Sequence, residues 1–219
     1  MLEVVIATGN RHKTRELTGL LRVPGVRWRP LADFPGAPRA AETGRTFDEN
    51  AARKARAIAR ATGRWALADD SGLEVEALGW GPGVRSARFA GRHGDDRANN
   101  AKLLRALAGL PPPGRRARYR CSLALASPAG VAAVARGAWS GRIAEAPRGR
   151  RGFGYDPLFF VPRFGKTVGE LPASVKRRLS HRARAARRLR PVLRRLAARF
   201  NGPRRGGSGG GRPAPGRAV

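Results

Sequence analysis

The first residues whose types and spacing could do chemistry form the segment Thr8-Gly9-Asn10-Arg11-His12-Lys13, which follows the apolar stretch 2–7. A strand that turns through glycine into a helix presents unpaired backbone N–H groups and the positive end of the helix dipole. Lys13 adds a positive charge at the same place, so the segment suits a polyphosphate. The spacing of a Walker loop is missing, and an ordinary strand–helix turn is the alternative.

Two adjacent carboxylates, Asp69 and Asp70, end a short apolar segment and are followed by Ser71 and Gly72. Carboxylates at the end of a strand, opposite a phosphate-binding turn, are where Mg²⁺ is commonly held. Neighbouring residues of an extended strand point to opposite faces, so we expect one carboxylate to face a cleft and the other to be structural. The alternative is a solvated turn, in which Asp, Ser and Gly are common.

The C-terminal third holds two further candidate groups. The first is Phe153-Gly154-Tyr155-Asp156-Pro157, whose rings could stack on a nucleobase while Asp156 accepts a hydrogen bond from an N–H of the base edge. A packed turn before a strand explains the same residues equally well. The second group is Lys176, His181 and Arg182, which can donate to phosphate or to a purine carbonyl oxygen. A basic helix start is the alternative for this group.

Apolar periodicity predicts the elements that position these groups. The capping box of Thr46 and Glu49 predicts a helix that runs through Thr62. Pro191 should kink or split the last helix, because proline lacks a backbone donor and clashes with the preceding turn. We expect strands at residues 2–8, 65–68, 117–126, 130–139 and 158–161, and helices at 13–22, 47–62, 95–107 and from 180 onward.

Composition limits the function classes. The 219-residue chain has 41% apolar residues, enough for a packed core, and one cysteine, Cys121, which excludes an intrachain disulfide and a cysteine-based zinc site. The N-terminus lacks a signal-peptide pattern and no stretch approaches a membrane span, so we expect a soluble, cytoplasmic protein without a membrane partner. We predict one domain over residues 1–201 and a disordered, basic Gly/Arg/Pro-rich tail over 202–219.

The formal net charge of +30 suggests a nucleic-acid partner. Yet 40 of the 45 basic residues are arginine, and this ratio in a chain rich in Ala, Gly and Pro is typical of a genome-wide codon bias. Acidic residues are sparse after residue 100, where only Glu145, Asp156 and Glu170 occur. Nucleic-acid binding by the basic tail is therefore an open alternative, which a steep salt dependence would reveal.

Six motifs follow one another along the chain. Together they resemble the inosine/xanthosine triphosphate pyrophosphatase family over residues 1–200. They are Thr-Gly-Asn-x-x-Lys-x-x-Glu (Thr8 to Glu16), Phe-x-Glu-Asn-Ala (Phe47 to Ala51), Ala-Asp-Asp-Ser-Gly-Leu (Ala68 to Leu73), Pro-Gly-Val-x-Ser-Ala-Arg (Pro82 to Arg88), Phe-Gly-Tyr-Asp-Pro (Phe153 to Pro157) and Lys-x-x-x-Ser-His-Arg (Lys176 to Arg182).

This resemblance implies a homodimeric, Mg²⁺-dependent enzyme. Such an enzyme cleaves non-standard purine nucleoside triphosphates (ITP, dITP, XTP) to the monophosphate and pyrophosphate, and so removes deaminated purines from the nucleotide pool. The implied fold is α/β, an elongated mixed β-sheet with flanking helices in two lobes around a nucleotide cleft.

The resemblance also implies residue roles. The turn from Thr8 to Lys13 would hold the triphosphate, and the loop from Phe153 to Asp156 would form the base pocket. Asp70 would bind the metal and accept a proton, with Ser71 beside it as a substrate contact. Lys176, His181 and Arg182 would complete the substrate contacts, and His181 or Arg182 is the expected donor to the 6-keto oxygen of the purine.

The chain departs from the family pattern at Ala41, where many members carry a metal-binding glutamate before the Glu-Thr-Gly that is Glu42 to Gly44 here. Either Glu42 reaches the metal or water fills that ligand position. Val175 stands where an acidic residue often precedes the lysine. Two other functions are alternatives: a pyrophosphatase that prefers other nucleotides, such as modified pyrimidines, and a nucleic-acid-binding protein with a vestigial pocket.

Overall fold

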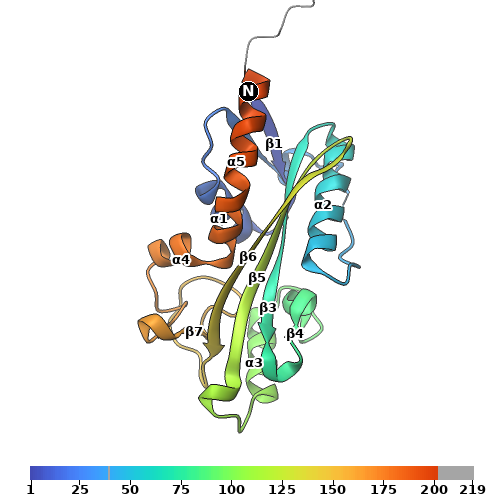
Figure 1. Ribbon diagram of the computed structural model, residues 1–219. Coiled ribbons are helices and arrows are strands. Elements are labelled where there is room, and N and C mark those ends of the chain that lie inside the picture. The colour runs from blue at the N-terminus through green and yellow to red at the C-terminus, as the bar shows by residue number, and fades with distance from the viewer. Residues whose placement is uncertain (39, 202–219) are drawn as a thin grey trace, which may run out of the picture.

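One mixed β-sheet runs along the length of the molecule (Figure 1). The computed structural model describes residues 1–38 and 40–201. Strand β1 is parallel to both of its neighbours, β2 and β3, and the other pairs are antiparallel. The strands are β1 (Leu2–Ile6), β2 (Val26–Pro30), β3 (Trp65–Val75), β4 (Gly81–Pro82), β5 (Arg116–Ser127), β6 (Gly130–Ile143), β7 (Phe159–Val161) and β8 (Lys166–Thr167), in the order β2-β1-β3-β5-β6-β7-β8 with β4 beside β3.

Helices flank this sheet, and the predicted mixed sheet with flanking helices is thereby confirmed. In the upper half of Figure 1, α1 and α5 lie on one side of the long strands and α2 on the other, while α3 and η3 lie at the lower end. The helices are α1 (Arg11–Leu20), α2 (Phe47–Thr62), α3 (Asp96–Ala106), α4 (Ala173–Leu179) and α5 (His181–Asn201), and the short 3₁₀ turns are η1 (Leu31–Asp33), η2 (Glu76–Leu78), η3 (Gly83–Arg88), η4 (Pro112–Arg115) and η5 (Pro162–Phe164).

Three apolar clusters hold the layers together. One joins β1, α1 and α5 through residues such as Leu17 and Leu189, and a second joins α2 to the opposite sheet face through Ala55 and Ala124. The third fills the lower half around Phe159. Strand β3 passes from the upper clusters to the lower one, and its polar residues lie between them. The functional candidates on β3 are therefore held in place from both ends of the strand.

Side-chain caps set where the helices near the site begin. Helix α1 begins at Arg11, two residues before the predicted start, because the Asn10 side-chain oxygen accepts from the N–H groups of His12 (2.9 Å) and Lys13 (3.1 Å). Helix α2 has the predicted bounds, since Thr46 Oγ1 accepts from the N–H of Glu49 at 3.1 Å. These caps satisfy donors that a helix N-terminus otherwise leaves unpaired.

Two alternatives that the sequence allowed are excluded, namely a solvated turn from Asp69 to Gly72 and a last helix split at Pro191. The alternative that Asp69 to Gly72 forms a solvated turn fails, because β3 continues through it as an 11-residue strand paired with β5. Helix α5 is a single helix through Pro191 rather than two, and Pro191 lies on its exposed side, where water can reach the carbonyl that the missing N–H leaves unpaired. The predicted tail, residues 202–219, lies outside the described residues. Among the described residues, no helix is long and apolar enough to cross a membrane.

Strand β6 approaches the start of α5 at Gly137, and this contact admits no side chain. A Cβ atom at Gly137 would stand 2.0 Å from the carbonyl oxygen of His181 and 2.6 Å from the backbone nitrogen of Ala185. We expect Gly137→Ala to lower the free energy of unfolding by about 3 kcal/mol, because backbone atoms must shift to relieve the overlap. Chemical denaturation measures this change.

The matched control is Gly19→Ala inside α1, where an added Cβ meets nothing within 4 Å. Alanine favours a helix over glycine, so this variant should be slightly more stable than the parent chain. If Gly137→Ala were as stable as Gly19→Ala, the close approach of β6 and α5 would not be real.

Candidate active site

Strand β3 presents its two neighbouring carboxylates to opposite faces of the sheet. Asp69 is buried on the face of α1 and α5, where it accepts from Lys13 Nζ at 2.7 Å and from Arg182 Nε at 2.8 Å. The Ser71 hydroxyl donates to the same carboxylate at 2.8 Å. Burial opposes ionisation of Asp69, but the charges of Arg182 and Lys13 outweigh it and hold its pKa well below the usual value. Asp69 is therefore the structural carboxylate of the pair.

Asp70 lies on the face of α2, in a second group of charges. Lys54 Nζ is 2.8 Å from Asp70 Oδ1 and 2.7 Å from Glu42 Oε1, so its ammonium group bridges the two carboxylates. Asn50 Nδ2 donates to Asp70 Oδ2 at 3.2 Å, and Arg88 pairs with Glu42 at 3.0 Å. Burial raises the pKa of Asp70 above its ordinary value, although Lys54 acts against the shift.

The turn at the start of α1 lies beside both groups of charges. Asn10 and Lys13 line the cavity described below, and Thr8 Oγ1 accepts from the N–H of Asn10 at 3.2 Å. The Asn10 side chain occupies the N–H groups of His12 and Lys13. Hence two of the backbone donors that were expected to be free are already engaged here. Arg11 and Gly9 are exposed at the edge of this turn.

The loop that contains Phe153 is folded around the carboxylate of Asp156. Asp156 is buried, and its oxygens accept from Tyr119 Oη (3.1 Å), the Phe153 N–H (2.9 Å) and Lys176 Nζ (2.6 Å). Burial raises the pKa of Asp156, while Lys176 acts against this shift. Its oxygens are thus used within the protein, and the predicted bond from Asp156 to a base edge gains no support.

The Phe153 ring connects this loop to the turn at the start of α1. It stacks on His12 with 5.2 Å between ring centroids, and Lys176 Nζ lies 4.4 Å from its centroid. Arg182 lies 5.6 Å from the same centroid. An aromatic face beside cations is favourable. The predicted triphosphate turn and the predicted base loop are therefore neighbours, although about 140 residues of chain separate them.

Helix α5 contributes Arg182 and His181 at its first turn. The guanidinium group of Arg182 donates to Asp69, to Glu16 Oε2 at 2.6 Å and to Ser71 Oγ at 2.6 Å. The His181 ring stacks on Tyr119, and its Nδ1 is buried without a partner in the described part of the chain. Burial, and then the nearby cations, lower the pKa of His181 well below the usual value, so the imidazole is neutral near pH 7.

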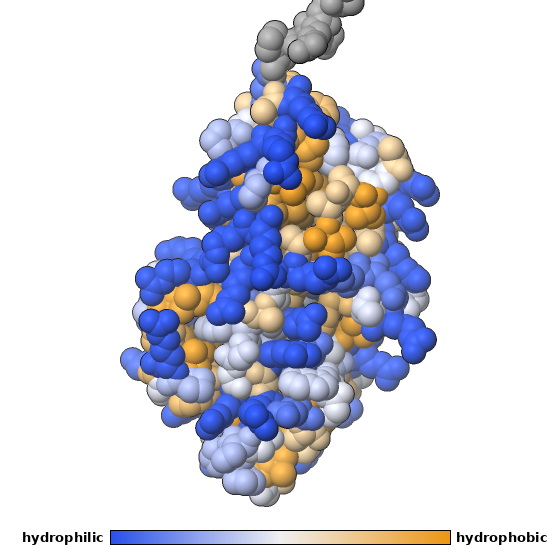
Figure 2. All heavy atoms as spheres, in the orientation of Figure 1, coloured by the Kyte–Doolittle hydropathy of each residue, from blue (hydrophilic) through white to orange (hydrophobic). Residues whose placement is uncertain are grey.

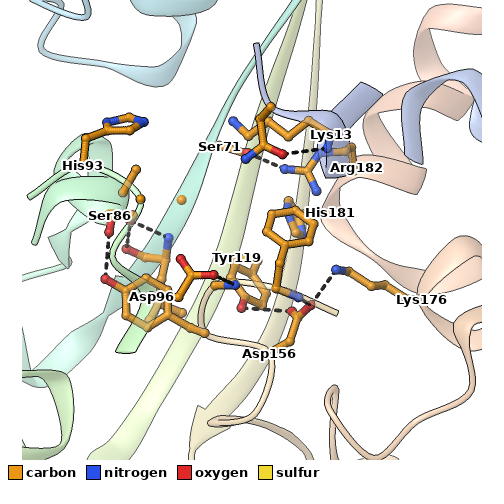
Figure 3. Close-up of a pocket in the computed structure, with 18 residues that line it drawn as sticks. Lys13, Ser71, Ser86, His93, Asp96, Tyr119, Asp156, Lys176, His181 and Arg182 are labelled. Atoms are coloured by element: carbon orange, nitrogen blue, oxygen red, sulfur yellow. Dashed lines mark hydrogen bonds and ion pairs between the residues drawn. The ribbon is translucent and has the colours of Figure 1, made fainter. Parts of the chain in front are cut away.

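A cavity opens where these elements meet (Figure 3). It brings together most of the predicted substrate-binding residues, whereas Asp70 and Glu42 stand outside its lining, on the α2 side of β3. The charge of Lys13 nevertheless acts on both carboxylates and favours their ionised forms. The predicted residues that line the cavity are Asn10, Lys13, Ser71, Phe153, Gly154, Tyr155, Asp156, Lys176, His181 and Arg182.

Comparison with known proteins identifies the family of the chain. The family model described as the Ham1 family matches residues 4–192. The chain belongs to the Ham1 family. It is 52% identical to a dITP/XTP pyrophosphatase of Geobacillus kaustophilus, over 86% of this chain and 93% of that protein, and 48% identical to one of Rhodopirellula baltica, over 90% and 95%.

Solved structures agree with this assignment. A HAM1 protein from Coxiella burnetii is 43% identical with a TM-score of 0.81, covering 88% of this chain and 98% of its own. The Staphylococcus aureus Ham1 protein is 38% identical with a TM-score of 0.79, covering 89% and 99%. The resemblance drawn from the six motifs is therefore confirmed.

Sequence reasoning missed several residues of this Ham1 site. Lys54 is the most important, because it joins Asp70 to Glu42. A signal was present: Asn50 and Lys54 are four residues apart in the predicted helix, so they share a face and both reach Asp70. Glu16 occurs in the first motif, yet its pairing with Lys176 and Arg182 depends on the packing of α1 against α4 and α5. The cavity lining also includes Ser86, His93, Asp96 and Tyr119.

The Asp69 cluster yields a stability prediction. Asp69→Asn removes the charge that Lys13 and Arg182 share, and leaving buried cations without their partner costs about 3–5 kcal/mol. Since the pKa of Asp69 is depressed in the folded state, its contribution is complete above the unfolded-state pKa of about 4 and is lost as pH falls through the lower folded value. We therefore expect the parent chain and the variant to converge in stability only below about pH 4.

Denaturation at several pH values measures this difference. The control is Glu76→Gln, which breaks the exposed Arg116–Glu76 pair (2.8 Å) and should change stability little. Equal stability of Asp69→Asn and the parent chain at pH 7 would refute the structural role of Asp69.

Proposed function

We propose that this chain hydrolyses non-standard purine nucleoside triphosphates, namely ITP, dITP and XTP, to the nucleoside monophosphate and pyrophosphate. The observation that carries the proposal is the cavity itself, in which lysine and arginine from three separate elements meet one aromatic ring beside an acidic pair. The names of its relatives support it, since proteins similar over almost the whole chain are called dITP/XTP pyrophosphatases.

The positive groups would bind the triphosphate. Lys13 and Lys176 line the cavity, and each now rests against a carboxylate, Asp69 or Asp156. Phosphate oxygens can share these ammonium groups, because lysine carries three donors on a flexible stem. The ion pairs with these carboxylates fix the positions of the two ammonium groups at the cavity before substrate arrives. Binding energy is then not spent on ordering them.

Mg²⁺ fits the acidic pair on the α2 side. Asp70 and Glu42 already hold one cation between them, the ammonium group of Lys54, and they offer the hard oxygen ligands that Mg²⁺ prefers. Among the described residues no third acidic, His or Cys side chain joins them, so phosphate oxygens and water would complete the coordination. When bound, the ion would neutralise phosphate charge and favour the departing pyrophosphate.

Asp70 would act as the proton acceptor. The oxygen of a water molecule attacks the α-phosphorus, the bond from that phosphorus to the bridging oxygen breaks, and the water proton passes to Asp70. Burial raises the pKa of Asp70, which makes it a stronger base than an exposed aspartate. Asn50 holds one carboxylate oxygen by its amide, and so fixes the direction in which the other points.

Discrimination against ATP would lie at purine position 6. A donor that suits the keto oxygen of hypoxanthine or xanthine faces the amino group of adenine, and a buried donor without an acceptor costs about 1–3 kcal/mol. Neutral His181 has one N–H to offer, and Arg182 retains donors beyond its bonds to Asp69, Glu16 and Ser71. We place the base end of the substrate beside these two residues.

We further propose that the chain works as a homodimer in the cytoplasmic nucleotide pool. The family resemblance supports the dimer, and light scattering of the purified chain would test it. The compartment is supported by the chemistry alone, since deaminated purine triphosphates arise where nucleotides are stored.

Asp70→Asn gives the direct test of the mechanism. The amide is the same size but cannot accept a proton from water, so kcat for ITP should fall by about a thousandfold or more while the fold survives. Pyrophosphate release from ITP, dITP, XTP, ATP and modified pyrimidine triphosphates measures both the loss and the substrate class. Asp33→Asn is the control, because Asp33 lies in η1, pairs with Arg29 and does not line the cavity. Near-full activity of Asp70→Asn would exclude the proton-acceptor role, and a preference for pyrimidines would replace the substrate class.

The metal site yields a second test. Glu42→Gln removes one of two carboxylate charges, so the Mg²⁺ concentration for half-maximal activity should rise by about tenfold. Ala41→Glu adds a carboxylate next to it and should lower that concentration. A titration of Mg²⁺ at saturating ITP measures both. An unchanged midpoint in Glu42→Gln would show that water, rather than Glu42, completes the metal site.

A further inference from the structure

Gly154 of the base loop is bonded to helix α3 through both of its peptide groups. The N–H of Gly154 donates to Asp96 Oδ2 at 2.7 Å, and its carbonyl oxygen accepts from Asn100 Nδ2 at 3.0 Å. Asp96 and Asn100 are four residues apart on one helix face, and neither occurs in the six motifs. Figure 3 shows Asp96 reaching the loop from the side of the cavity opposite Lys176.

These two hydrogen bonds from α3 hold a part of the loop that the loop's own residues hold only weakly. The backbone of Gly152 and Gly154 has positive φ (82° and 65°), so a glycine with easy rotation stands on each side of Phe153. Asp156 fixes the N–H of Phe153 from within the loop. Without α3, the Phe153–Gly154 peptide group would keep only the bond from the Asp156 N–H to the Phe153 carbonyl oxygen (3.3 Å), and the Gly154 carbonyl would lose its bond to Asn100. Glycine has no side chain that could hold these groups instead.

The Phe153 ring depends on that position. It stacks on His12 of the triphosphate turn and lies against Lys176 and Arg182, so a rotation at Gly154 would move the aromatic wall of the cavity. The other end of the same loop is fixed as well, since Tyr155 Oη donates to the carbonyl oxygen of Ser86 at 2.8 Å. Helix α3 and turn η3 therefore act on the cavity through the loop.

We propose that Asp96 and Asn100 are positioning residues, which hold Gly154 so that Phe153 stands ready to receive the purine. This inference rests on the proposed function and adds to it two residues outside the reacting groups. Asp96 also lines the cavity, but in the described part of the chain neither residue hydrogen-bonds to the triphosphate turn or to the carboxylates Asp70 and Glu42. Their loss should therefore weaken substrate binding more than turnover.

Three variants separate positioning from general stability. Asp96→Ala removes the acceptor, whereas Asp96→Asn keeps a side-chain oxygen that can accept from Gly154 and should rescue the contact. Asn100→Leu removes the donor together with a buried Oδ1 that has no partner in the described residues, so its cost in stability is small. The control is Asp95→Ala, which removes the cap of the same helix, the bond from the N–H of Ala98 to Asp95 (2.9 Å), but leaves Gly154 untouched.

The first measurement is hydrogen exchange of the amides of residues 152–156 in the chain without nucleotide. Asp96→Ala and Asn100→Leu should speed this exchange by about tenfold, as expected for the loss of one hydrogen bond. Asp96→Asn and Asp95→Ala should leave it near the parent value. Unchanged exchange in Asp96→Ala would overturn the proposal, because α3 would then not hold the loop.

The second measurement is steady-state hydrolysis of ITP with Mg²⁺. Asp96→Ala and Asn100→Leu should raise KM by about tenfold and change kcat by less than about threefold. Faster exchange with an unchanged KM would overturn the positioning role, and so would an equal rise of KM in Asp95→Ala. If the parent chain releases no pyrophosphate from any triphosphate, the proposed function fails and the role in substrate binding fails with it. Hydrogen exchange, which needs no substrate, still decides whether α3 holds the loop.

Discussion

The buried carboxylate of Asp69 is the contact on which the site depends. It receives Lys13 from α1 and Arg182 from α5 at 2.7 and 2.8 Å, and so joins three elements that are far apart in the sequence. A buried charge in this position is tolerated because it is paired at short distance with Arg182, which is also buried, and with Lys13, which is partly buried. Glu16 extends the same chain of charges to Lys176, and Lys176 extends it to Asp156 in the base loop. The cavity walls are thus tied into one network of ion pairs.

The alternation of side chains along β3 places two neighbouring aspartates in different surroundings and so gives them different roles. Asp69 and Ser71 face α1 and α5, where full pairing keeps Asp69 ionised and structural. Asp70, one residue away, faces α2 and meets Lys54, Glu42 and Asn50 in surroundings that raise its pKa. One strand therefore places a permanent negative charge on one face and a basic carboxylate on the other. A shift of register by one residue would exchange these roles.

Sequence reasoning predicted the parts of the molecule that local physics decides. The capping box at Thr46, the hairpin of β5 and β6 and the separation of Asp69 from Asp70 all follow from periodicity and side-chain chemistry. The residues from Asp69 to Gly72 are compatible with a turn as well as a strand, because Asp, Ser and Gly favour turns, and pairing with β5 overrides that preference. The partners of Glu16 and Asp96 could not be predicted, since each contact crosses between elements whose packing is not encoded locally. The bond from Asp96 to Gly154 spans 58 residues.

The arginine excess has a structural use in the described part of the chain. Buried Arg115 donates to the carbonyl oxygens of Ile143 and Leu107, and Arg190 donates twice to that of Leu20 at the end of α1. A planar guanidinium group with five donors can satisfy several carbonyls at once, which lysine cannot do. Other arginines extend from α5 into solvent, where Figure 2 shows hydrophilic side chains along that helix. A high net charge is therefore compatible with a nucleotide enzyme, because several of these side chains bond to backbone carbonyl oxygens within the fold. Charge composition alone could not tell the arginines that bond to carbonyl oxygens from those exposed to solvent, whereas their hydrogen-bond partners in the structure do.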